Sequence, residues 1–194
     1  MANDIDEIKL INSQKIVEKF RDYVVSQSRA NLSKGGKNVT NGLYNVIQGE
    51  VINDNGFFVV GFDLGPYGSF QDQGVRGKSS SLKAPNSPFR FGTGTGRKGG
   101  LTEGIQKWVK AKGFLFRDKK TGRMLSREST AYLITRSIYH TGIKPSLFFT
   151  KPFEAGFKKY IDVSLLLEFG KDVETIIDYG METILPDNIG PIKK

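Results

Sequence analysis

Residues 42–62 read GLYNVIQGEVINDNGFFVVGF, a stretch with two strand-like halves and a turn between them. Its two halves, residues 42–52 and 56–62, are rich in β-branched and aromatic residues, which favour extended strands. Between them the sequence NDNG at residues 53–56 supplies the residue types that tight turns prefer. The stretch therefore predicts a β-hairpin.

Upstream of this hairpin, apolar residues recur at helical spacing over roughly residues 5–33, before a Lys34-Gly35-Gly36 stop. We therefore predict a long N-terminal amphipathic helix. Downstream, residues 67–71 are expected to form a short third strand of the same small antiparallel sheet.

The second half of the chain predicts mostly helix. Helical patterns cover three segments, which are residues 101–113, 128–139 and 153–179. The last of them is expected to form one long helix or a broken pair of helices. The polar turn between residues 114–116 and 124–125 is typical of a small hairpin, and the two prolines that bound residues 145–152 predict a rigid elbow. Together the elements predict an α+β fold in a single domain over residues 1–194, with a C-terminal tail at residues 180–194.

Composition excludes several classes of protein. The chain has 194 residues and no cysteine, so no disulfide framework, thiolate nucleophile or cysteine metal site is expected. No run of eighteen apolar residues occurs, which argues against a membrane helix, and the N-terminus lacks the apolar run of a secretory signal. We expect a soluble protein without a membrane partner.

Residues 73–102 form the most unusual segment, because these thirty residues contain no acid. Seven glycines, two prolines and four serines leave it little apolar surface to bury, so we expect a long flexible loop without structure of its own. Its basic residues are the first candidates for contact with an acidic or phosphate-bearing partner, or with a neighbouring subunit: Arg76, Lys78, Lys83, Arg90, Arg97 and Lys98.

The excess of basic residues continues beyond this loop. Residues 73–151 carry 17 basic and 3 acidic side chains, whereas the flanking parts of the chain are mildly acidic. Such a surplus attracts polyanions, although a solvated basic surface explains it equally well. Within the loop, Phe89 and Phe91 flank Arg90, an arrangement that suits stacking on nucleic-acid bases or anchoring in a pocket of another chain.

No catalytic, cofactor or metal site is predicted. Residues 94–99 match the dinucleotide pattern G-x-G-x-x-G, but a proline and an arginine stand where the preceding buried strand should be. His140 is the single histidine, and we interpret it as a capping or packing residue. Nothing in the spacing of Asp63 and Asp72 supports a metal site. A nucleotide-dependent enzyme is the weakest of three hypotheses.

Three short motifs carry a resemblance to a known family. They are YGSFQDQG at residues 67–74, GLTEGIQKWVKAKGF at residues 100–114, and GIKPSLFF at residues 142–149. In this order, after a long helix and a hairpin, they resemble the tail-completion and neck (head-to-tail connector) proteins of tailed bacteriophages. The resemblance covers about residues 5–160 of this chain.

The resemblance implies a structural virion protein without catalysis or cofactor. It implies a homo-oligomeric ring of about six or twelve copies, assembled in the host cytoplasm and located in the virion neck or tail region. Portal or adjacent neck and tail proteins are the implied partners. The basic loop then either becomes ordered on neighbouring subunits, which we favour, or contacts genomic DNA in the channel. The alternative function is a non-enzymatic nucleic-acid-binding protein that uses the basic residues 73–151.

Overall fold

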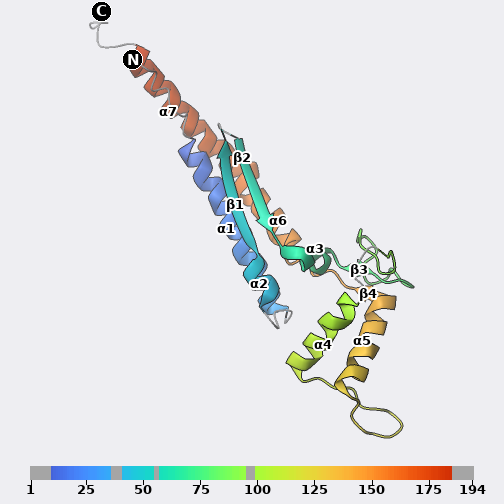
Figure 1. The fold of residues 1–194 in the computed structure, drawn as a ribbon. Helices are drawn as coiled ribbons and strands as arrows, with labels where there is room; N and C mark the ends of the chain where they lie inside the picture. Colours follow the sequence, from blue (N-terminus) through green and yellow to red (C-terminus); the bar gives the residue numbers. More distant parts are fainter. Residues whose placement is uncertain (1–9, 36–40, 55–56, 95–98, 185–194) are drawn as a thin grey trace, which may run out of the picture. The chain divides into compact units, whose positions relative to one another are not determined.

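The computed structural model describes residues 10–35, 41–54, 57–94 and 99–184, the last five of these by their backbone alone. The chain divides into two compact units (Figure 1). The first unit contains residues 1–26, 49–62 and 151–194, and the second unit contains residues 27–48 and 63–150. The single domain over residues 1–194 stays a prediction, because two clusters of contacts do not decide the number of domains.

The described residues form helices and two small two-stranded sheets, which confirms the predicted α+β class. The helices are α1 (Ile11–Lys34), α2 (Gly42–Val46), α3 (Gly65–Gln73), α4 (Gly100–Lys112), α5 (Arg127–Thr141), α6 (Thr150–Gly156), the π-helix η1 (Phe157–Leu165) and α7 (Leu166–Ile184). The strands are β1 (Gln48–Asp54), β2 (Phe57–Asp63), β3 (Val75–Arg76) and β4 (Gly142–Ile143).

The first unit packs the hairpin and the C-terminal helices around one aromatic residue of α1. Phe20 is buried, and its ring lies edge-on to Phe62 of β2, with the ring centroids 6.0 Å apart, and to Phe153 of α6 at 5.5 Å. Phe157 of η1 completes the cluster, with its ring centroid 6.3 Å from that of Phe20. Edge-to-face contacts of this kind add stabilisation to the burial of apolar area. The predicted β1–β2 hairpin is confirmed, and this cluster packs it against α1 and the C-terminal helices.

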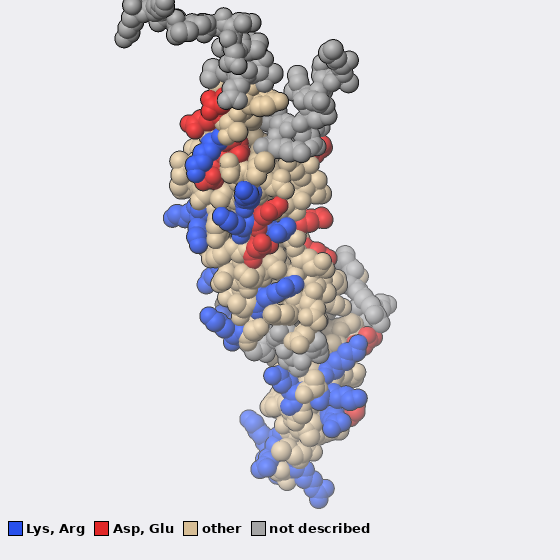
Figure 2. Space-filling view, turned by 90° about the vertical axis from the view of Figure 1, so that its left-hand side faces the viewer, with Lys and Arg blue, Asp and Glu red and all other residues tan. Residues whose placement is uncertain are grey.

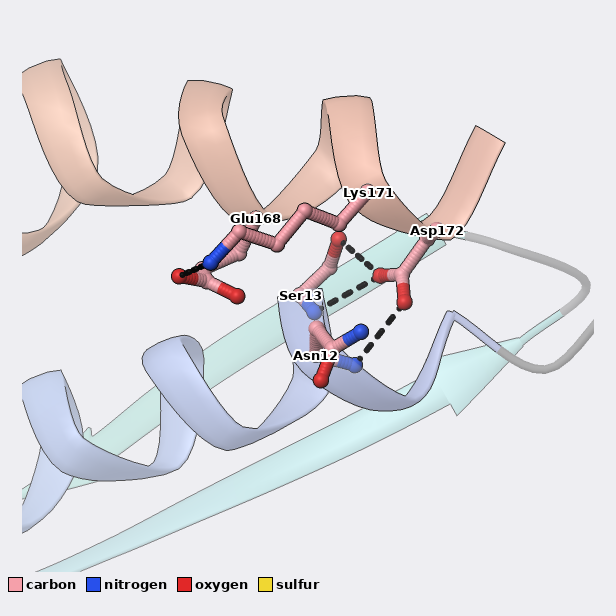
Figure 3. A network of polar contacts seen from close by, with 5 residues as sticks. All are labelled: Asn12, Ser13, Glu168, Lys171 and Asp172. Carbon is pink, nitrogen blue, oxygen red and sulfur yellow. Dashed lines mark hydrogen bonds and ion pairs between the residues drawn. The ribbon is translucent and has the colours of Figure 1, made fainter. Parts of the chain in front are cut away.

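A buried carboxylate joins α7 to the beginning of α1 (Figure 3). Asp172 of α7 accepts hydrogen bonds from the backbone N–H of Asn12 at 3.0 Å and of Ser13 at 2.8 Å, and from the Ser13 hydroxyl at 2.6 Å. The first N–H groups of a helix have no partner within the helix, and the helix dipole favours a negative charge there. Asp172 therefore caps α1 from a distant part of the chain.

The surroundings of Asp172 act on its ionisation in two directions. Burial opposes the charged form, but the hydrogen bonds from Ser13 and Asn12 together outweigh that effect and hold the pKa of Asp172 below its ordinary value. The carboxylate therefore stays charged and stabilises the folded chain at neutral pH.

The second unit contains an α4–α5 helical hairpin. Val109 of α4 and Ala131 of α5 are fully buried, and Ser126 caps α5 by accepting the N–H of Ser129 at 3.1 Å. Between the helices, Leu125 donates its N–H to the Phe116 carbonyl at 2.8 Å, which confirms the small hairpin predicted there.

A second buried carboxylate organises the connection before α6. Asp72 accepts hydrogen bonds from the N–H groups of Phe149, at 2.8 Å, and Thr150, and from the Thr150 hydroxyl. Next to it, β3 pairs with β4 in antiparallel register, with Val75 opposite Ile143. Phe148 is buried inside this connection, as expected for a rigid elbow.

Two predicted strand segments are wrong. Residues 67–71 belong to helix α3, where Pro66 occupies the first turn and so loses no hydrogen bond. Residues 42–46 form helix α2, so the strand begins only at Gln48. In both cases a helix forms despite a local β-propensity, which depends strongly on context.

The other predicted helices are confirmed, with small shifts of their ends. Helix α1 covers Ile11–Lys34, and the predicted residues 5–9 lie outside the described residues. The last predicted helix is a helical run through α6, η1 and α7. Its final residues, 180–184, fall in the segment predicted as a tail, and residues 185–194 are outside the described part.

Replacing Asp172 by Ala should lower the free energy of unfolding by about 1–2 kcal/mol at pH 7, because α1 loses its cap. Since the folded-state pKa is depressed, this contribution is present above the unfolded pKa of about 3.9 and disappears as the pH falls through the folded value. Denaturant titrations at pH 7 and at low pH measure both effects. Glu174→Ala, at an exposed position of the same helix, is the control, and an equal loss in both variants would contradict the capping role.

Candidate partner-binding interface

Charge is separated between the two units. The first unit carries 10 basic and 15 acidic side chains, a net charge of −5. The second unit carries 19 basic and 5 acidic side chains, a net charge of +14. In Figure 2, Lys and Arg side chains gather over the end of the second unit that holds α4, α5 and the loop between them. The second unit therefore presents the candidate surface for an acidic partner.

The described part of the basic segment, residues 73–94 and 99–102, differs from the flexible loop that the sequence predicts. Its backbone is bonded to the last turn of α5, because Lys78 donates its N–H to the Tyr139 carbonyl at 2.9 Å and Ser79 donates to the His140 carbonyl at 3.2 Å. The last carbonyls of a helix need such donors, since the helix itself supplies none. The segment is thus held on α5 by main-chain hydrogen bonds.

The same segment also closes on itself. Arg76 donates its N–H to the Phe89 carbonyl at 2.8 Å, and Phe91 donates to the Arg76 carbonyl at 2.9 Å. Inside the turn, the buried Ser87 hydroxyl donates to the Gly74 carbonyl at 2.7 Å. These bonds satisfy the backbone where little apolar surface is available, which is why a segment poor in apolar residues is still folded.

Gly77 allows the close approach to α5. A Cβ atom at this position would lie 2.1 Å from the His140 carbonyl oxygen, far inside van der Waals contact. Any other residue would therefore push the basic segment away from the end of α5.

Both aromatic candidates pack on their own chain. Phe89 is half-buried, and its ring lies edge-on to Phe70 of α3, with the centroids 4.5 Å apart. Phe91 is also half-buried, and its ring centroid is 5.9 Å from that of Tyr139 of α5. They anchor the basic segment itself, which differs from the expected role in another chain's pocket or on a base.

The basic candidates are mostly exposed. Lys83 donates to the Thr141 hydroxyl at 2.8 Å, Arg90 donates to the Lys78 carbonyl at 3.1 Å, and the Lys78 ammonium lies 5.8 Å from the centre of the Tyr139 ring. These three charges therefore share the surface near the end of α5. Arg76 is half-buried in β3. The remaining candidates, Arg97 and Lys98, lie outside the described residues.

The basic surface extends beyond the predicted candidates onto α4, the following loop and the start of α5. The further exposed basic residues are Lys107, Lys110, Lys112, Arg117, Lys119, Lys120, Arg123 and Arg127. Within that loop Asp118 accepts the backbone N–H of Thr121 at 2.7 Å, which together with the Thr121 hydroxyl lowers its pKa. The charge surplus of residues 103–151 was the signal for these positions.

The candidate catalytic groups are occupied in local structure. Asp72 caps the α6 connection, Asp63 accepts the Gly65 N–H at 2.7 Å, and the His140 ring nitrogen Nδ1 lies 2.9 Å from the Ser79 hydroxyl. Among the described residues, no group of three histidine, aspartate or glutamate side chains is placed to hold a metal ion. Four residues of the glycine pattern, 95–98, lie outside the described part.

Comparisons with known proteins give no relative: no family model, curated protein or solved structure matches this chain. Of the helices in the described residues, none has the length and apolar character needed to cross a membrane.

Gly77→Ala should detach the basic segment from α5 and accelerate its cleavage by trypsin, because its Cβ would collide with the His140 carbonyl. Limited proteolysis followed by mass spectrometry measures cleavage after Lys78, Lys83 and Arg90. Gly104→Ala in α4 is the matched control, since its Cβ would meet open space. Equal cleavage rates in the two variants would contradict this account of the segment.

Proposed function

We propose that this chain is a non-enzymatic structural subunit of a ring in the neck of a tailed bacteriophage, between portal and tail. The resemblance of residues 67–74, 100–114 and 142–149 to neck and tail-completion proteins gives the class of assembly. The single observation that carries the assembly role is the separation of charge between the two units.

Opposite charges on two different surfaces of one chain favour head-to-tail association of copies. The first unit of one copy, at −5, attracts the second unit of another, at +14. A contact between unlike surfaces repeats from copy to copy, and it closes into a ring when the rotation between neighbours allows it. The charge separation therefore supports a ring more than an isolated chain.

Large apolar side chains on the surface support the same role. Phe57 of β2 is 77% exposed, Leu166 of α7 is 71% exposed and Tyr132 of α5 is 60% exposed. Leu166 belongs to a run of exposed apolar residues on α7 with Leu167 and Phe169, and contiguous apolar surface is typical of protein interaction sites. The surplus of positive charge left after such pairing is available for acidic surfaces of portal or tail proteins.

The basic segment serves as a contact surface in this proposal. Its described part is folded on α5, so Lys78, Lys83 and Arg90 present their charge in a defined arrangement. A prearranged surface loses less conformational entropy on binding than a disordered loop does. This refines the earlier expectation that the segment becomes ordered only on neighbouring subunits.

Light scattering of the purified protein at physiological salt, alone and with short duplex DNA, tests the proposal. We expect a discrete oligomer whose mass does not depend on DNA. An interaction with a micromolar Kd is almost fully formed at a protein concentration of about 100 μM. A chain that stays monomeric at that concentration and that coats DNA would contradict the ring.

The basic surface favours one second candidate function, non-enzymatic nucleic-acid binding. In that case DNA affinity should be tight and fall steeply with salt, as counterions are released. Lys119→Glu with Lys120→Glu should then reduce both the affinity and the salt slope, as measured by filter binding. Lys15→Glu with Lys19→Glu, two exposed positions of α1, is the charge-matched control. Equal affinity of the two double variants would argue against a site on the second unit.

A further inference from the structure

Helix α7 presents an apolar stripe to solvent. Leu166, Phe169, Val173 and Ile177 follow one another at helical spacing of three and four residues, which places them on one face. Leu166 is 71% exposed and Ile177 is 53% exposed, while Phe169 is 45% exposed and Val173 is half-buried. A soluble helix ordinarily turns such a stripe towards its own core.

The polar contact with α1 keeps this stripe outside. Asp172 is bound to Asn12 and Ser13, so the side of α7 that carries Asp172 faces α1 (Figure 3). Rotating the stripe inwards would remove the carboxylate from the three donors at the α1 N-terminus. The first unit therefore leaves the stripe for another occupant.

The negative charge of α7 indicates which kind of surface can cover the stripe. The helix contains five acidic residues and one lysine, Lys171, which pairs with Glu168 at 2.8 Å. Exposed acids, among them Glu174 and Asp178, lie on α7 close to the stripe. Two copies of α7 would repel each other, whereas an apolar surface surrounded by basic residues complements this helix.

The α4–α5 hairpin has this complementary character. Trp108 on α4 and Tyr132 and Leu133 on α5 expose apolar surface. Over residues 100–141 the chain carries nine basic and three acidic side chains, and Lys107, Lys110 and Arg136 are exposed close in sequence to these apolar residues. An amphipathic helix that docks by residues at i, i+3, i+4 and i+7 is a common mode of recognition.

We propose that the apolar stripe of α7 docks on the α4–α5 hairpin of a second copy of this chain. Leu166, Phe169 and Ile177 contact the exposed apolar residues of the hairpin, and Glu174 and Asp178 face its lysines and arginines. The inference rests on the proposed ring and names the contact that joins neighbouring subunits. Because the two surfaces differ, each copy offers one of each and the contact repeats around the ring.

Cross-linking tests this contact directly, because the chain contains no cysteine of its own. Ile177→Cys on α7 is mixed with Tyr132→Cys on α5 or with Lys110→Cys on α4, and a thiol-reactive bismaleimide is added. We expect a covalent dimer of Ile177→Cys with at least one of the two hairpin variants. Phe57→Cys on β2, at an apolar position that is more exposed than Ile177, is the control and should give no dimer with either.

Charge reversal provides an independent readout. Glu174→Lys with Asp178→Lys should weaken self-association at least tenfold in sedimentation, and mixing it with Lys107→Glu plus Lys110→Glu should restore association. All four positions are exposed, so the variants are expected to fold. Circular dichroism checks this for each of them.

The outcomes separate this contact from the proposed function. A wild-type oligomer without the hairpin cross-link and without rescue by the reversed pair would overturn the α7 contact while leaving the ring. A dimer of Ile177→Cys with itself alone would overturn it in favour of α7 pairing. A wild-type chain without any oligomer would contradict the proposed function as well.

Discussion

The hydrogen bonds of Asp172 to the first turn of α1 are the contact on which the functional account depends. They satisfy two backbone donors and one hydroxyl that the helix cannot satisfy itself, and they fix which side of α7 faces its own unit. The aromatic cluster around Phe20 packs the neighbouring helices and the hairpin, but it does not bury the Leu166–Ile177 side of α7. The proposed contact with a second copy would cover that stripe.

In the second unit, too, hydrogen bonds to the ends of a helix hold distant segments together. Here they are main-chain bonds in a segment with little apolar surface. The basic segment is bonded to the carbonyls of Tyr139 and His140, and Gly77 permits the close approach. Positive charge is thereby held on a folded surface, while the first unit has a net negative charge. The two units thus differ in net charge, and this difference is the basis of the proposed association.

Local patterns in the sequence predicted most of the elements. What they missed depends on a competing local signal in one case and on long-range contacts in the others. The turn residues of the sequence between β1 and β2, the α1 periodicity and the glycine after α4 are local signals, and the two strands, α1 and α4 are confirmed. Residues 67–71 have aromatic residues that suit a strand, but Pro66 starts a helix there. The folding of the basic segment depends on α5, about sixty residues away in sequence, and the capping of α1 depends on Asp172, 159 residues from Ser13. No local pattern contains these pairings.

For the candidate site, the sequence indicated the exposed basic residues, while the rings of Phe89 and Phe91 are engaged within the chain.

An electron cryomicroscopy reconstruction of the assembled protein would show which surfaces join neighbouring copies. The account predicts a closed ring in which α7 of each copy lies on the α4–α5 hairpin of the next, with Leu166 and Ile177 buried. A ring joined through other surfaces that leaves the α7 stripe in solvent would contradict the proposed contact. A protein that remains monomeric at concentrations well above micromolar would contradict the assembly itself.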